Sequence, residues 1–69
     1  FIFKDADIKE IMTELEQWYQ IKTVYKGNVY HQFNAVFSRT ENLSQILKLL
    51  ELNGNVHFKT ENNIVYVHP

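Results

Sequence analysis

Three histidines are the residues of this chain best suited to bind a metal or to transfer a proton. His31 stands alone in a predicted loop, whereas His57 and His68 fall in two segments that we expect to pair as strands. As cross-strand neighbours they could share a metal, but a stable zinc site needs further ligands and no third one is suitably placed. The chain also contains no cysteine. We therefore expect no metal and no cofactor.

The other side chains that could do chemistry are dispersed. Glu10, Glu14 and Glu16 share the polar face of a predicted helix, so nothing forces two acids together to raise one pKa. Ser38 and Ser44 have no histidine in a suitable sequence context, and no glycine-rich loop is present to hold a phosphate. A domain this small also has little room for a pocket. The sequence predicts a protein that is not an enzyme and has no small-molecule substrate.

Length and composition indicate a single folded domain over residues 1–69. Hydrophobic residues make up 45% of the 69 residues, with only two glycines and one proline. The net charge of −1 lacks the basic surplus of a typical nucleic-acid-binding module. The chain has no GxxG loop, and its segment 33–39 lacks the glycine and the opening base of an RNA-binding strand motif. A small nucleic-acid-binding module is therefore a remote alternative.

The first predicted helix must position most of the core. Asp7 suits the N-cap, and Glu10 would complete a capping box three positions later. Spacings of three and four residues then form one apolar stripe, which we expect to be buried. Its members are Ile8, Ile11, Met12, Leu15, Trp18 and Tyr19.

A second predicted helix opens at Asn42, with Gln45 as its capping-box partner. Gly54 would end it in the left-handed conformation that glycine tolerates. The main apolar stripe consists of Leu43, Ile46, Leu47 and Leu50. Leu49 and Leu52 lie off that stripe, and two explanations remain open. The helix is covered on two sides, as it would be between two sheets, or the two leucines form part of a docking surface for another protein.

Five strands are expected around these helices, at 1–3, 21–26, 33–38, 56–60 and 64–68, with a turn at Gly27-Asn28. The fold class is α+β, in the order β-α-β-β-α-β-β. A weak internal repeat places Asp7–Met12 on Asn42–Leu47 and Ile21 on Val56, at an offset of 35 residues. It indicates either a duplicated unit or only two capped amphipathic helices.

The register of the last hairpin can be predicted from its turn residues and its apolar alternation. A two-residue turn at Asn62-Asn63 suits type I′, because both residues tolerate positive φ. This turn sets Thr60 opposite Val65, Phe58 opposite Val67 and His57 opposite His68. The predicted core face then holds Val56, Phe58, Thr60, Val65 and Val67, and a three-residue loop would mix the two faces.

The same register leaves Ile64 and Tyr66 on the outer face of the hairpin. We expect the partner surface to use sheet edges and exposed apolar side chains rather than charge, because the net charge is near zero. The candidate partner-binding residues are therefore Leu49, Leu52, Ile64 and Tyr66.

These elements carry a family resemblance over essentially the whole chain. Its most specific part is the Leu-x-x-Trp-Tyr step from Leu15 to Tyr19, and the later Phe37-Ser38-Arg39, Gly54 and terminal Pro69 agree with it. The sequence resembles the C-terminal domain of FecR-type anti-sigma regulators, especially the Bacteroidetes form. It departs at Ala35-Val36, where the family often has a glycine. The resemblance implies two helices sandwiched between two small sheets, as in secretin and TonB-receptor short N-terminal domains.

The resemblance also implies a role. Such regulators are single-pass inner-membrane proteins whose missing cytoplasmic part would hold an extracytoplasmic-function sigma factor. Their periplasmic part contacts the signalling domain of a TonB-dependent outer-membrane transporter. Because the chain starts in a strand and has no initiator Met, we interpret it as a piece of such a membrane-anchored protein. The alternatives within this fold are the transporter's own signalling domain and a secretin N-terminal domain. The oligomeric state and the nutrient sensed are not predicted.

Overall fold

A computed structural model describes residues 2–69, so the predicted start of the first strand at Phe1 lies outside the described residues. The observed order confirms the predicted β-α-β-β-α-β-β arrangement. The elements are β1 (Ile2–Ala6), α1 (Ile8–Tyr19), β2 (Lys22–Tyr25), β3 (Phe33–Val36), α2 (Leu43–Asn53), β4 (His57–Glu61) and β5 (Ile64–His68).

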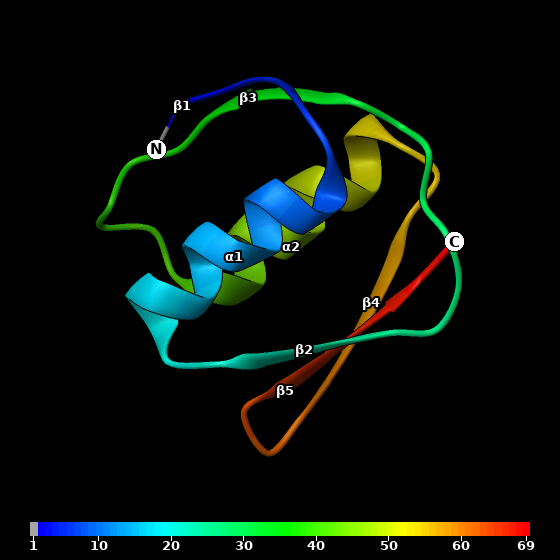
Figure 1. The fold of residues 1–69 in the computed structure, drawn as a ribbon. Coiled ribbons are helices and arrows are strands. Elements are labelled where there is room, and N and C mark those ends of the chain that lie inside the picture. The colour runs from blue at the N-terminus through cyan, green and yellow to red at the C-terminus, as the bar shows by residue number, and fades with distance from the viewer. Residues whose placement is uncertain (1) are drawn as a thin grey trace.

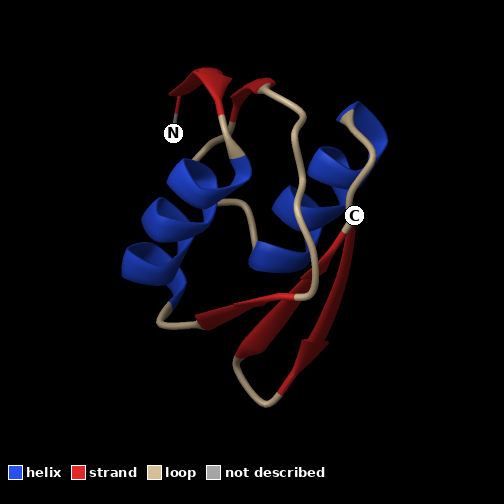
Figure 2. Cartoon of the chain, turned by 45° about the vertical axis from the view of Figure 1, so that its right-hand side comes forward, coloured by secondary structure: helices blue, strands red, loops and turns tan. Residues whose placement is uncertain are grey.

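The strands form two separate sheets with the helices between them. β1 and β3 make a two-stranded antiparallel sheet, and the other sheet has the order β2-β5-β4. Within the second sheet β2 runs parallel to β5, and β4 runs antiparallel to it. Figure 1 and Figure 2 show α1 and α2 lying between the two sheets, as the resemblance implies.

Both helices begin at the predicted N-caps. The Asp7 carboxylate accepts a hydrogen bond from the Glu10 amide at 2.9 Å, and the Asn42 side chain accepts one from the Gln45 amide at 2.9 Å. The Gln45 side chain returns the bond by accepting from the Asn42 amide at 3.2 Å, which completes a capping box. Among the described residues, α1 shows only the first of these two bonds.

The structure confirms that α2 ends at Asn53-Gly54, but the predicted left-handed conformation of Gly54 was wrong. Gly54 is extended, with φ −164°, whereas Gln20 at the end of α1 adopts the left-handed conformation, with φ 52°. A Cβ on Gly54 would lie 2.7 Å from Cδ2 of His31 and 2.8 Å from Cε1 of Phe33. Glycine is needed here because the side chains of His31 and Phe33 lie close to the backbone of residue 54. No left-handed turn is involved.

The core is continuous between the two sheets. Both helical stripes, the inner face of β5 and the inward residues Phe33 and Phe37 are buried, as their spacing predicts. Leu43 and Tyr19 are half-buried at its margin. Trp18 is the exception: its side chain is 46% exposed, which corrects the prediction that it is core.

The final hairpin has the predicted register. Thr60 pairs with Val65, Phe58 with Val67 and His57 with His68. Asn62 and Asn63 have φ values of 49° and 66°, as a type I′ turn requires. Of the predicted core face, the three valines at positions 56, 65 and 67 are buried and Phe58 is half-buried. Thr60, next to the hairpin tip, is exposed rather than core.

Candidate interaction surfaces

The structure confirms the predicted pairing of two histidines. His57 and His68 are cross-strand partners, whereas the ring of His31 packs edge-on against Phe33 with 4.8 Å between centroids. Residues 2–69 contain no group of three or more histidine or acidic side chains that could hold a metal ion.

Leu49 and Leu52 project from α2 into solvent, with 39% and 75% of their surfaces exposed. They line a shallow depression together with Glu41, Gln45 and Lys48. The explanation that a second sheet covers them is therefore wrong. α2 contacts β4 of the three-stranded sheet, and the strands of the other sheet are only five and four residues long. We attribute the exposure to that small sheet, which leaves one side of α2 uncovered.

Ile64 and Tyr66 lie on the outer face of the three-stranded sheet, because the alternating residues Val65 and Val67 point inward and are buried. Both are half-buried rather than fully exposed, because neighbours on β2 and β4 flank them. The structure does not bring the four predicted residues together. α2 lies on the inner side of this sheet, so the leucines and the Ile64–Tyr66 pair belong to separate surfaces (Figure 1).

Sequence reasoning missed an aromatic surface at the end of α1. The guanidinium carbon of Arg39 lies 4.1 Å from the ring centroid of Trp18, within range of a cation–π interaction. The neighbouring Tyr19 hydroxyl donates a 2.6 Å hydrogen bond to the Glu41 carbonyl oxygen. Trp18 satisfies the helical spacing, but it lies in the last turn, where the core ends. Nothing in the sequence pairs it with Arg39.

A second missed surface is the outer face of β1 and β3. Ile2 and Val36 are cross-strand partners and are 81% and 76% exposed. Their inward neighbours, Phe3 and Phe37, are buried and stack edge-on with 6.2 Å between ring centroids. The alternation of Ile2 with Phe3, and of Val36 with Phe37, could have predicted this exposure.

The junction between α1 and β2 contains the clearest electrostatic perturbation. The Glu16 carboxylate accepts a 2.9 Å hydrogen bond from the Thr23 amide. Two residues further along β2, burial raises the pKa of Tyr25, and the negative charges of Glu16 and Asp7 raise it further. This carboxylate joins the helix to the edge strand.

No described helix has the length and the apolar character needed to cross a membrane. The geometry is that of a small domain that presents several apolar patches and no assembled catalytic centre among residues 2–69.

Comparisons with known proteins agree with this geometry. A comparison with curated proteins finds none that matches. Among solved structures, a protein from Parabacteroides distasonis that is assigned as an anti-sigma factor superposes with a TM-score of 0.79 at 16% sequence identity. The match covers 99% of this chain and 32% of that protein, so the chain spans about a third of its length. The family model for the C-terminal region of FecR matches residues 1–67, and that family is non-enzymatic. The chain therefore belongs to the FecR C-terminal domain family.

Proposed function

We propose that this domain is the periplasmic signalling module of a membrane-anchored anti-sigma regulator. In this role it docks to the signalling domain of a TonB-dependent outer-membrane transporter, and the missing cytoplasmic part holds an extracytoplasmic-function sigma factor. Family membership supports a regulator rather than the transporter or a secretin. The fold shared with the Parabacteroides protein is consistent with this role.

The observation that carries the docking function is the set of large apolar side chains left in solvent. Leu49 and Leu52 on α2 are 39% and 75% exposed and line one depression in a chain of 69 residues. Apolar side chains left in water add little to the stability of a fold, and contiguous exposed apolar groups commonly mark contact surfaces. The open side of α2, with Leu49 and Leu52, is our first candidate for the contact, and Ile64 with Tyr66 is the second.

Titration calorimetry of the chain against the transporter's signalling domain tests this function. Leu52→Gln should melt near wild type, because the side chain is mostly in solvent, and should lose binding if α2 makes the contact. Tyr66→Ser makes the same test of the sheet, although a half-buried ring also contributes to stability. Ile2→Gln, on the opposite sheet, is the matched control and should bind as wild type does. No measurable binding by the wild-type chain would refute the proposed function.

A further inference from the structure

The outer face of the three-stranded sheet gathers positive charge around an apolar centre. In one row across the sheet, Tyr66 lies between Val24 of β2 and Lys59 of β4. In the next row, Ile64 lies between Lys22 and Glu61. The ammonium group of Lys26, just beyond β2, lies 5.5 Å from the ring centroid of Tyr66. We call Lys22, Val24, Lys26, Lys59, Ile64 and Tyr66 the basic sheet face.

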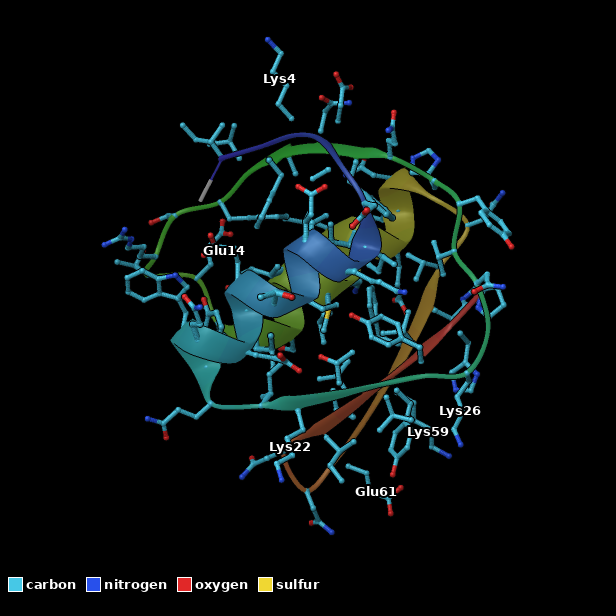
Figure 3. The ribbon with its side chains drawn as sticks, in the orientation of Figure 1. Lys4, Glu14, Lys22, Lys26, Lys59 and Glu61 are labelled. Atoms are coloured by element: carbon cyan, nitrogen blue, oxygen red, sulfur yellow. The ribbon has the colours of Figure 1, made fainter. Side chains whose placement is uncertain are left out.

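Charge is unevenly distributed between this face and the rest of the molecule. Its three lysines and the adjoining Glu61 give a local charge of +2, although the whole chain carries −1, so the remainder carries −3. Figure 3 shows Lys22, Lys26, Lys59 and Glu61 around this sheet, with Lys4 and Glu14 on the other side of the molecule. The near-zero net charge predicts little part for charge in docking, but that value hides this separation.

We propose that the basic sheet face binds an acidic, extended protein segment in which carboxylates flank an apolar side chain. The apolar side chain would lie over Tyr66 and Ile64, and the carboxylates would reach the lysines on the two edge strands. Positive groups at the rim of an apolar centre are the arrangement that steers and orients an oppositely charged partner. This inference rests on the proposed docking function, and it specifies the chemistry of the partner.

Two other occupants fit less well. An anionic membrane surface is usually recognised by clusters of about four to eight basic residues, and this face has three together with an acidic residue. A second copy of the chain would have to offer an acidic surface. Asp7, Glu10 and Glu14 line one depression together with Lys4 and Lys9, so that surface is not uniformly acidic. Lysines on edge strands also discourage unwanted strand pairing, and that role alone would produce no ligand binding.

The test uses a labelled synthetic peptide that alternates glutamate with valine, and a matched peptide with glutamine in place of glutamate. Fluorescence anisotropy measures affinity, and amide chemical shifts locate the site. We expect only the acidic peptide, and not the glutamine peptide, to bind and to shift the amide signals of β2, β5 and β4. Lys59→Glu should weaken binding about three- to tenfold, because it reverses one charge at the contact. The control, Lys4→Glu, makes the same change of net charge on β1 and should leave affinity unchanged.

The outcomes separate the competing accounts. Equal losses for Lys59→Glu and Lys4→Glu, or shifts confined to other elements, would overturn the proposal. So would binding to phosphatidylglycerol vesicles without binding to the peptide, or no binding at all. If the transporter's signalling domain binds Lys59→Glu as tightly as wild type, this inference fails while the proposed function stands. If the acidic peptide binds here and the signalling domain does not bind the chain, the inference stands and the proposed function fails.

Discussion

The two halves of the chain, β1-α1-β2 and β3-α2-β4, share equivalent hydrogen bonds and equivalent apolar positions between the N-cap of the helix and the strand that follows it. In the first half Glu16 accepts a hydrogen bond from the Thr23 amide at 2.9 Å. In the second half Glu51 accepts a hydrogen bond from the Phe58 amide at 2.8 Å. Glu51 lies 35 residues after Glu16, and Phe58 lies 35 residues after Thr23. Apolar residues recur at the same offset: Ile8 and Leu43, Ile11 and Ile46, Met12 and Leu47, Leu15 and Leu50, Ile21 and Val56.

The halves diverge where the helices end. Trp18-Tyr19 in the first half corresponds to Asn53-Gly54 in the second. The first pair places an indole against Arg39, whereas Gly54 lets the ring of His31 approach the backbone. A hydrogen bond from an edge-strand amide to a glutamate in the preceding helix is no general property of capped helices. We therefore interpret the halves as a repeated unit that was modified at the helix ends.

The largest effect is expected from the equivalent core leucines, Leu15 and Leu50, which are both fully buried. Leu15→Ala and Leu50→Ala should each destabilise by about 2–5 kcal/mol, as deletions of this kind usually do. A domain of this size holds on the order of 5 kcal/mol in total, so both variants should be largely unfolded at elevated temperature. Thermal melts followed by circular dichroism measure this, with Leu52→Ala as the exposed control. A mild effect in only one half would break the equivalence.

Gly54 provides the next largest effect and tests why the halves differ. Any Cβ at this position must displace His31 or the buried ring of Phe33, so we expect Gly54→Ala to cost about 1–3 kcal/mol. Gly54→Asn should cost at least as much, because its side chain is larger. A left-handed cap would instead favour asparagine over alanine. Urea unfolding of both variants decides, and a more stable asparagine variant would contradict the close-approach explanation.

Trp18 tests the difference between the halves at the end of α1, as Gly54 does at the end of α2. Full burial would make Trp18→Ala cost about 3–5 kcal/mol. With 46% of the side chain exposed, we expect about 1–2 kcal/mol from the apolar area that remains buried. In a domain of this length that is a melting-point decrease of roughly 4–16 °C. Arg39→Ala should cost less, since it removes a cation–π contact at an exposed position. A change of only a degree or two would mean that Trp18 contributes almost nothing to folding.

Much of this fold is predictable because helix caps, apolar periodicity and turn residues are local properties. Asp7, Asn42 and the Asn62-Asn63 turn determine where elements begin and how the hairpin pairs, and none of them depends on distant residues. The errors concern contacts between segments far apart in sequence. Gly54 depends on His31 and Phe33, which the chain brings to it from more than 20 positions away.

The candidate sites were predictable only in part, for the same reason. Exposure of Ile64 and Tyr66 on the outer face follows from the hairpin register, although their half-burial depends on β2. Whether Leu49 and Leu52 are covered depends on how far the two-stranded sheet extends, which helical periodicity does not determine. The basic sheet face requires β2 to pair with β5, a parallel contact about 40 residues apart that no local pattern reveals.

Glu16 and Glu51 offer a more direct test of whether the two halves are equivalent, with a smaller expected change in stability. Glu16→Ala and Glu51→Ala each leave an edge-strand amide without its acceptor, and each should cost about 1 kcal/mol. Urea titrations of the single and double variants measure these costs. Glu14→Ala, on the exposed side of α1, should change stability much less. Unequal losses at the two positions would show that the bonds resemble each other in geometry alone.

The smallest effect concerns Tyr25, which has no aromatic counterpart in the second half, where Thr60 lies at the same offset. The pKa of Tyr25 is raised above 10.0 by burial and by Glu16 and Asp7, so the folded chain holds the phenol proton more tightly than the unfolded chain does. The resulting stability is present below the unfolded pKa and is lost as the pH rises through the folded value.

Tyr25→Phe removes this contribution. The wild type should therefore lose more stability than the variant between about pH 9 and pH 11, as measured by urea midpoints at each pH. The difference should be small, because a ring 39% exposed remains well solvated. Tyr30→Phe deletes the same hydroxyl group from a side chain in open solvent, and it should follow the wild-type curve. If Tyr25→Phe also follows that curve, burial and the carboxylates of Glu16 and Asp7 do not raise the pKa of this phenol, and the electrostatic difference between the halves disappears.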